Sequence, residues 1–236
     1  MNEIRSAVGA SSYPGRGILI GKSADAKCAY LAYFIMGRSE NSRNRVFVED
    51  GAGLRTEAFD PAKLVDPSLI IYHPVRVHGE CTVVTNGDQT DTVYDALVSG
   101  GSFHDALGTR TFEPDAPNYT PRISAMLTRK GGDFALEMSV LRCFDGQGGG
   151  ALRSFFEYES IPAGLGLFIH TYAQDGDPLP SFGGEPELVA LDMDFDAFSE
   201  SVWRSLDADN KVSLWTRRIE LSSGETETRI FNKHAE

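Results

Sequence analysis

Residues 122–141 read RISAMLTRKGGDFALEMSVL, and this stretch decides the fold. Apolar and β-branched residues dominate 123–128 and 134–141, and the turn Lys130-Gly131-Gly132-Asp133 lies between them. Two strand-forming runs joined by a short glycine-containing turn predict a β-hairpin. The sequence therefore predicts two antiparallel strands joined by this turn.

A second hairpin is predicted near the N-terminus. Residues 18–21 and 29–36 are apolar runs, and Lys22-Ser23-Ala24-Asp25 between them is turn-like. Runs of the same kind predict further strands at 46–48, 69–77, 82–85, 153–159, 165–172, 212–219 and 225–231.

Two segments carry helical spacing instead. Val93, Ala96 and Leu97 predict a helix over 90–97, after the turn signal Asn86-Gly87-Asp88, and a longer apolar stripe predicts a helix over 194–206. The proline- and glycine-rich residues 174–186 predict a long surface loop. The predicted strands outnumber the predicted helices, and the sheets they form need helices to cover them. This pattern indicates an α+β fold.

Composition limits the function classes. The chain has 236 residues, 41% of them hydrophobic, and a formal net charge of -12. This length favours one domain over residues 1–236. An acidic chain without a basic face is not expected to bind nucleic acid or a membrane surface. The start of the chain lacks the pattern of a secretory signal, and three widely spaced cysteines predict reduced thiols, so we expect a cytoplasmic protein.

Common catalytic motifs are missing from the sequence. The run GILIGKS (17–23) is similar to a phosphate loop, but that loop needs glycine at position 16, where this chain has Arg16. The five histidines have no metal-binding spacing, and no G-x-S-x-G motif is present. We therefore expect neither a metal nor another cofactor.

Arginines and rigid polar loops remain as candidates. Arg38 and Arg45 lie in a basic loop between two strands, and arginine can grip a phosphate with two parallel hydrogen bonds. Tyr72 and Arg76 are four residues apart on a predicted strand, so they share a face. Glu113 lies in a proline-stiffened loop before a strand. Each segment alone is equally compatible with a solvated loop or ordinary packing.

Taken in order, these segments resemble the archaeal-type IMP cyclohydrolase family. The matching pieces are YPGRG (13–17), RS (38–39) followed by NR (44–45), DP (66–67) leading to Tyr72 and Arg76, VVTNGDQTD (83–91), and FEPD (112–115) running into NYTPRI (118–123). The resemblance covers residues 13–142. This chain has a longer spacer at 40–43 than the family usually carries, and it is longer beyond residue 146.

The resemblance implies a fold, a reaction and a set of site residues. The fold is a four-layer αββα sandwich resembling N-terminal-nucleophile hydrolases. Members of the family lack the self-processed nucleophile of those hydrolases, and Met1-Asn2 is consistent with this because neither residue can act as one. The reaction closes 5-formamidoimidazole-4-carboxamide ribonucleotide to IMP with loss of water. The implied catalytic residues are Arg38 for the developing oxyanion, Tyr72 for the formyl group and Glu113 for proton transfer. The implied substrate-binding residues are Asn44, Arg45, Asn86, Gly87, Thr120 and Arg122.

Two other functions remain open from the sequence. One is a different amide hydrolase on the same fold, and the other is a non-catalytic purine-nucleotide-binding protein. For the enzyme, the expected partners are the small-molecule nucleotide substrate, the IMP product and further copies of the chain in a homo-oligomer. Residues 146–190 are a candidate insertion that covers the pocket or forms the oligomer contact.

Overall fold

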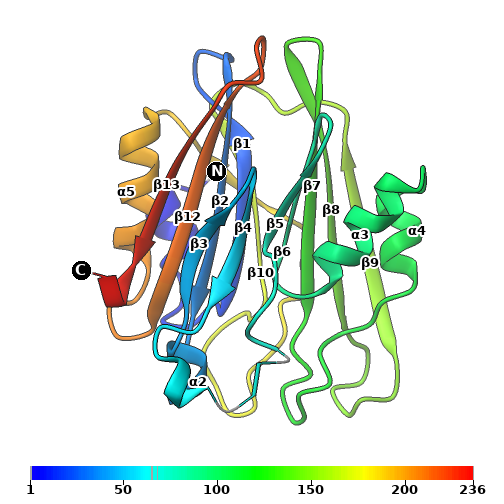
Figure 1. Cartoon of the computed structure of the whole chain (residues 1–236), viewed down its shortest axis with the longest axis vertical. Coiled ribbons are helices and arrows are strands. Elements are labelled where there is room, and N and C mark those ends of the chain that lie inside the picture. The colour runs from blue at the N-terminus through cyan, green and yellow to red at the C-terminus, as the bar shows by residue number, and fades with distance from the viewer. Residues whose placement is uncertain (1, 65, 68, 236) are drawn as a thin grey trace.

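Two antiparallel β-sheets form the body of the protein in a computed structural model that describes residues 2–64, 66–67 and 69–235. The six-stranded sheet has the order β11 (Glu187–Ala190), β10 (Leu165–His170), β1 (Arg16–Lys22), β2 (Cys28–Met36), β12 (Lys211–Glu220) and β13 (Thr226–Asn232). The seven-stranded sheet has the order β3 (Val46–Asp50), β4 (Gly53–Glu57), β5 (Val75–His78), β6 (Cys81–Thr85), β7 (Arg122–Lys130), β8 (Asp133–Cys143) and β9 (Ala151–Tyr158). The two sheets face each other in Figure 1.

Both predicted hairpins are confirmed. Strand β7 pairs with β8 from Arg122 opposite Leu141 to Lys130 opposite Asp133, so the turn consists of Gly131 and Gly132. Both glycines have positive φ, 53° and 89°, the conformation that a tight two-residue hairpin turn requires. The N-terminal hairpin pairs β1 with β2. The N-terminal hairpin supplies the two central strands of the six-stranded sheet, and β7 and β8 lie between β6 and β9 in the seven-stranded sheet.

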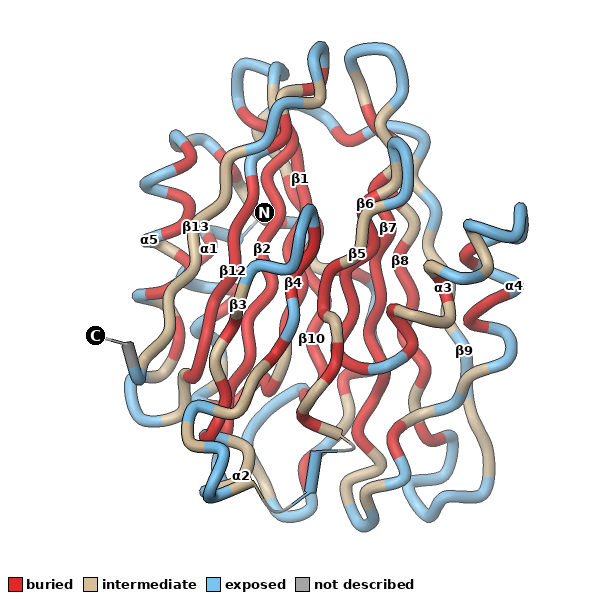
Figure 2. Tube along the Cα trace, viewed as in Figure 1, coloured by how far each residue is buried: buried red, intermediate tan, exposed pale blue. Residues whose placement is uncertain are grey.

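Alternation along the strands sends side chains to opposite faces of each sheet. In β2, Leu31, Tyr33 and Ile35 belong to the core between the sheets, whereas Ala32 and Phe34 belong to a second core on the outer face. Such a strand is apolar on both faces because both faces are covered. Figure 2 shows this as almost continuous burial along the inner strands.

Helices cover the outer faces of the sheets. Helices α1 (Ile4–Val8) and α5 (Phe195–Ser205) share a core with the six-stranded sheet. Helices α3 (Gln89–Val98) and α4 (Phe103–Gly108) share another core with the seven-stranded sheet. The layers thus follow the order helix, sheet, sheet, helix (Figure 1), which bears out the predicted α+β class. The remaining helical turns are α2 (Glu40–Arg43) and two 3-10 turns at Pro61–Lys63 and Lys233–Ala235.

The predicted helix over 194–206 is confirmed as α5, and its ends follow from the sequence. Asp194 caps it, because its carboxylate accepts a hydrogen bond of 2.8 Å from the backbone N–H of Ala197. Phe195, Phe198 and Val202 form its buried face. The 90–97 helix is confirmed as α3 with slightly wider bounds.

One predicted strand is largely wrong. Of the predicted 69–77, only the part from Val75 onward joins a sheet, as β5. The carbonyl of Pro67 instead accepts hydrogen bonds from the backbone N–H groups of Ile70 and Ile71, which makes a turn. The sequence also gave no prediction for β4, β11, α1 or α4, all of which are short.

The candidate insertion at 146–190 contributes directly to the sheets. It contains β9 and β10, and β10 pairs with β1 in the middle of the six-stranded sheet. Within it, residues 174–186 form no regular strand or helix apart from one isolated bridge at Ser181, as predicted for a loop.

The predicted domain ends, Met1 and Glu236, lie outside the described residues. No helix in the described part of the chain is long and apolar enough to span a membrane.

Candidate active site

The ends of several strands meet around one cavity of about 240 Å³ at one end of the sandwich. Of the predicted site residues, Arg38, Arg45 and Thr120 line it. Lining residues that the sequence analysis had not singled out include Tyr13, Arg16, Asp115 and Tyr172. Strands β1 and β7 start at this end and β2 ends here, so the sheets hold residues that are far apart in the sequence close together.

Arg45 brings a buried positive charge to the cavity. Its side chain is 1% exposed, and it donates hydrogen bonds to the carbonyl oxygens of Ser42 (2.8 Å) and Met36 (3.2 Å). Its Nη1 has no hydrogen-bond partner among the described residues. Burial lowers the pKa of Arg45. Buried donors are normally satisfied, so this nitrogen is available to a ligand oxygen.

Arg16 is a second guanidinium at the cavity, and it faces Glu113. Its Nη2 lies 3.4 Å from Oε2 of Glu113, and its Nε is buried without a partner among the described residues. Burial alone would lower the pKa of Arg16, but the negative charge of Glu113 and nearby tyrosines raise it well above the ordinary value. Arg16 therefore stays protonated and leaves one donor free.

Glu113 is 2% exposed and lies in the loop between α4 and β7, the strand that begins with Arg122. Burial raises the pKa of the Glu113 carboxyl, and the charges of Arg16 and Arg122 oppose that rise. A carboxyl group with a raised pKa can exchange a proton closer to neutral pH than an ordinary glutamate. The environment of Glu113 thus suits general acid–base chemistry.

Gly87 allows Arg122 and Glu113 to come close. A Cβ at Gly87 would lie 2.6 Å from Nη1 of Arg122 and 3.7 Å from Oε1 of Glu113. The Nη1 of Arg122 also donates to Oε1 of Gln89 at 2.7 Å and lies 2.7 Å from Oδ1 of Asp88. The predicted residues Gly87, Glu113 and Arg122 therefore form one cluster, and a side chain at position 87 would push it apart.

Tyr72 interacts with Arg16 and Arg45. Its hydroxyl is 2.7 Å from the hydroxyl of Tyr33, a fully buried residue of β2. Tyr72 and Tyr33 both interact electrostatically with Arg16 and Arg45. Tyr72 is thus part of the same charged cluster, as the sequence predicts, and its orientation is fixed by Tyr33.

Arg38 occupies a more exposed position at the mouth of the cavity. Its side chain is 36% exposed, and its Nη1 donates to Oδ1 of Asp175 (2.7 Å) and to the carbonyl of Gly176 (2.8 Å). The guanidinium also lies over the ring of Tyr13, 5.1 Å from its centroid. The 174–186 loop therefore reaches the mouth of the cavity through Arg38.

Thr120 connects the polar loop to the opposite wall. Its hydroxyl forms short hydrogen bonds with Asp115 and with the hydroxyl of Tyr172, and its backbone N–H donates to Oδ1 of Asp115 at 2.6 Å. Burial raises the pKa of the Tyr172 hydroxyl. Thr120 is thus held from both sides, which leaves little freedom in this wall of the cavity.

The structure does not bring the side chains of Asn44 and Asn86 to the cavity. The amide of Asn44 pairs with the backbone of Asp60, donating at 2.8 Å and accepting at 2.7 Å. The amide of Asn86, fully buried, bonds to the backbone of Pro121 and Ile123. Both predicted substrate-binding asparagines instead fix the loops that carry their neighbours, Arg45 and Arg122.

The sequence reasoning missed Arg16, Tyr33 and Tyr172. The sequence contains a signal for Arg16, because this residue belongs to the YPGRG segment of the resemblance. Its only predicted consequence is that the run 17–23 is not a phosphate loop. Tyr33 lies within an apolar strand, where its hydroxyl gives no pattern. Tyr172 follows β10, beyond the part of the chain that carries the resemblance.

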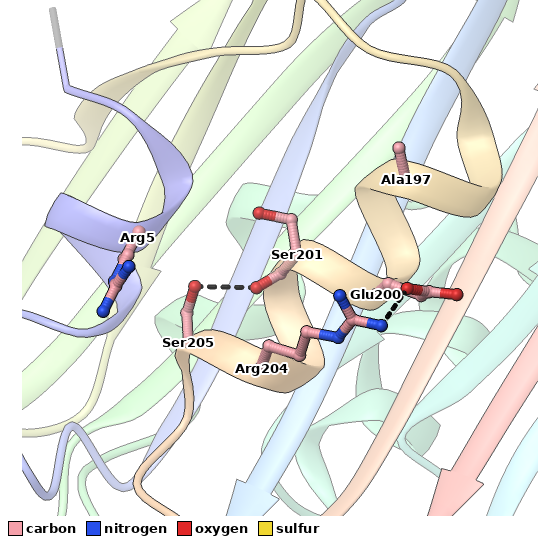
Figure 3. A pocket seen from close by; sticks show the side chains of 6 residues that line it. All are labelled: Arg5, Ala197, Glu200, Ser201, Arg204 and Ser205. Atoms are coloured by element: carbon pink, nitrogen blue, oxygen red, sulfur yellow. Dashed lines mark hydrogen bonds and ion pairs between the residues drawn. The ribbon is translucent and has the colours of Figure 1, made fainter.

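The described residues hold further hollows away from this cavity. No group of three or more His, Cys, Asp or Glu among them could hold a metal ion. A larger hollow of about 470 Å³ is lined by Arg5 of α1 and by residues of α5, and the bonds drawn there join side chains of α5 to residues of the same helix (Figure 3). There Arg204 pairs with Glu200 at 2.6 Å, and Ser205 donates to the carbonyl of Ser201. None of the predicted site residues lies in this hollow.

Comparison with known proteins agrees with this geometry. The family described as "IMP cyclohydrolase-like protein" matches residues 13–224, a range that contains every residue of the cavity. The IMP cyclohydrolase of Methanopyrus kandleri is 32% identical over 182 residues, which cover 72% of this chain and 89% of that protein. The IMP cyclohydrolase of Methanothrix thermoacetophila is 29% identical over 120 residues (49% and 58%), and that of Methanococcus maripaludis strain C6 is 32% identical over 124 residues (50% and 59%).

Proposed function

The chain belongs to the IMP cyclohydrolase family, and we propose that it closes the six-membered ring of IMP from 5-formamidoimidazole-4-carboxamide ribonucleotide, releasing water. One observation carries the assignment: Arg16, which lines the cavity, lies beside the buried carboxyl group of Glu113, and Arg122 and Tyr72 interact with this pair without lining the cavity themselves. The reaction needs a proton carrier and several fixed hydrogen-bond donors, and this cluster supplies both.

The reaction begins with a weak nucleophile. The carboxamide nitrogen must attack the formyl carbon on the same ring, so holding the formyl group in the reactive rotamer removes part of the barrier. The nitrogen must also lose a proton. Glu113 is the group we assign to this transfer, because burial raises its pKa and keeps bulk water away from it. The same carboxylic acid then returns this proton to the formyl oxygen, and the second proton of the departing water comes from the formamido N–H, which is lost as the C=N bond of the new ring forms.

Negative charge develops on the formyl oxygen during the attack. Donors that are fixed before the reaction stabilise such charge best. Arg16 and Arg45 are 11% and 1% exposed and each keeps a buried nitrogen without a partner among the described residues, so they suit this task. Tyr72, held by Tyr33, orients the formyl group. We therefore move the oxyanion role from Arg38 to these deeper arginines.

Arg38 fits the substrate's phosphate better than its reacting end. It is the most exposed of the three arginines that line the cavity, and it pairs with a carboxylate, Asp175. An anionic phosphate would compete for the same guanidinium. The cavity of about 240 Å³ is slightly smaller than the ~300 Å³ of the smallest usual ligand pockets, and we propose that the loop around Asp175 moves when the substrate binds.

An absorbance assay tests the proposed function. Purified protein is mixed with the formamido ribonucleotide in buffer containing a chelator, and the spectrum of IMP is followed over time. IMP formation well above the rate without protein supports the proposal. Tight IMP binding without turnover would indicate a nucleotide-binding protein, and release of formate without ring closure would indicate an amide hydrolase. Either result would refute the cyclohydrolase assignment.

We make four further proposals, which concern the relationship of the fold, the oligomeric state, the domain and the cellular compartment. The layer order of helix, sheet, sheet, helix supports a relationship to the N-terminal-nucleophile hydrolases. The open edge at β9 and the 72% exposed side chain of Phe144 beside it support a homo-oligomer, which light scattering would measure. We also propose that residues 1–236 act as one domain in the cytoplasm, and the three free thiols are in keeping with that compartment.

A further inference from the structure

A second polar cleft lies at the opposite end of the sandwich from the candidate active site. It has a volume of about 320 Å³ and is lined by the ends of β7 and β12 and by the turns that precede β4, β6 and β13. Strand β7 runs from Arg122 at the active-site cluster to Arg129 at this cleft. The two sites are therefore separated by the length of a strand.

Arg217 points between the sheets and into this cleft. It lies two residues from Trp215 and two from Ile219, both in the core between the sheets, so alternation places its side chain on the same face. Arg217 is 5% exposed and forms no ion pair with the described carboxylates. Burial lowers the pKa of Arg217, and the charge of Glu49 offsets this only in part.

The hydrogen bonds of Arg217 to the described residues all go to neutral groups. Its Nη1 donates to the carbonyl of Ala52 (2.7 Å) and its Nε to the hydroxyl of Thr228 (3.2 Å). A guanidinium has five N–H donors, and those on Nη2 take part in neither bond. The guanidinium also lies over the ring of Trp215, 5.0 Å from its centroid, but no carboxylate among the described residues forms an ion pair with it, and a buried charge without a counter-ion is unfavourable.

Arg129 brings a second guanidinium to the same cleft. It continues the inward-facing row of β7 beyond Leu127, and Gly224 lets it approach closely, since a Cβ there would lie 2.9 Å from Nη2 of Arg129. One side of Arg129 pairs with Glu80 at 2.5 Å, and Nη1 donates to the carbonyl of Leu221. Hydroxyl groups of Thr82, Ser223 and Thr226 complete the polar lining.

We propose that this cleft is a second anion site, which binds the phosphoryl oxygens of a small phosphorylated molecule between Arg217 and Arg129. Arginine pairs grip phosphate through parallel hydrogen bonds, and hydroxyl groups add further donors. In a chain with a net charge of -12, long-range attraction cannot bring an anion here, so short-range pairing must provide the affinity. The site is independent of the reaction proposed for the other end.

Tungstate, a heavy phosphate analogue, tests the location. Crystals of the full chain are soaked in tungstate, and its anomalous scattering is mapped. We expect a peak within hydrogen-bonding distance of Arg217 and Arg129. A peak confined to the cavity around Arg16 and Arg45 would overturn the proposal, and so would the absence of any peak.

Calorimetry with inorganic pyrophosphate tests the same site in solution. Arg217→Met should weaken binding to this site at least tenfold. Its matched control is Arg218→Met, which removes the same charge from the adjacent residue on the opposite face of β12, where Arg218 pairs with Glu227. The control should bind within twofold of wild type. Equal binding by the two variants would refute the assignment.

A second variant guards against loss of folding. If Arg217→Met lowers the melting temperature too far to be assayed, Arg129→Met replaces it, because Arg129 is less buried. It should weaken pyrophosphate binding severalfold, and unchanged binding would count against the site. Titration with AMP in parallel shows the source of the phosphoryl group: binding that depends on Arg217 indicates a nucleotide, and binding of pyrophosphate alone indicates an inorganic anion.

Discussion

Replacing Glu113 with glutamine tests the role of this side chain in proton transfer separately from its size and hydrogen bonding. Glutamine keeps the size and hydrogen-bonding reach of the side chain but cannot carry the proton. Because Glu113 is 2% exposed, bulk water cannot easily take over its task. General acid–base catalysis contributes about 10²- to 10⁴-fold, so kcat should fall by roughly a thousandfold, or about 4 kcal/mol of barrier.

Substrate binding should change much less. The ion pair of Glu113 with Arg16 spans 3.4 Å, longer than the ~2.7–2.9 Å of a strong charge-assisted hydrogen bond. Losing it should cost about 1 kcal/mol or less, and KM should therefore stay within about fivefold of wild type. The measurement is the initial rate of IMP formation across a range of substrate concentrations.

The pH profile gives a second readout. Burial raises the pKa of Glu113, so its carboxylate form is lost on acidification at a higher pH than the ~4.3 of an ordinary glutamate. If the carboxylate accepts the carboxamide proton, kcat/KM should decrease as the pH falls through this raised pKa. The Glu113→Gln variant should lack that acidic limb.

A matched control is available in β8. Burial also raises the pKa of Glu137, which lies outside the cavity, so Glu137→Gln makes the same change at a comparable but remote group. It should keep the wild-type rate and the acidic limb. Our assignment of Glu113 is wrong if Glu113→Gln binds IMP normally and turns over at the wild-type rate.

Three further outcomes are expected. Arg45→Met should weaken IMP binding by at least tenfold in calorimetry, since charged hydrogen bonds contribute about 1.5–3 kcal/mol, whereas Arg43→Met, in the adjacent turn outside the cavity, should bind within threefold of wild type. Tyr72→Phe should lower kcat by about tenfold to a hundredfold with little change in KM, because the hydroxyl group that orients the substrate is lost and the partner hydroxyl of Tyr33 stays buried; an unchanged kcat would exclude that role. Phe198→Ala should destabilise the fold by about 3–5 kcal/mol in denaturant unfolding, because Phe198 is fully buried under α5, while Phe144→Ala, at a 72% exposed position, should be nearly neutral.

The fold could be predicted where a local pattern and the tertiary structure agree. The turn at Gly131 and Gly132 fixes the register of β7 and β8 through its own backbone conformation, so it was visible in the sequence. The segment at 69–74 shows the opposite case. Its apolar residues favour a strand, but the turn after Pro67 uses the backbone N–H groups that a sheet would need.

The candidate site was predictable only in part, because long-range pairing assembles it. Glu113, Tyr72 and Arg122 came from the family resemblance. The structure places Glu113 near Arg122, and Tyr72 interacts with Arg16, the ion-pair partner of Glu113. Nothing local indicates that Arg16 at the start of β1 would face Glu113, 97 residues later. That contact depends on how the two sheets stack, which no short motif encodes. Asn44 and Asn86 belong to the motifs of the resemblance but do not reach the cavity. Their side chains instead form hydrogen bonds with the backbone of neighbouring segments.

The position of the charges follows from how the sheets are built. Arg16 and Arg122 are the first residues of β1 and β7, and each is paired with a neighbouring strand, Arg16 with Ile35 and Arg122 with Leu141, which holds their backbones. A donor at such a strand end is fixed before the substrate arrives, which is what stabilisation of a developing charge requires.

The two ends of the sandwich differ in one respect. At the candidate active site a carboxyl group, Glu113, is buried with the arginines, whereas Arg217 at the far end has only neutral hydrogen-bond partners among the described residues. A buried acid is needed to move protons and serves no purpose in holding an anion, so the first end suits catalysis and the second suits binding alone.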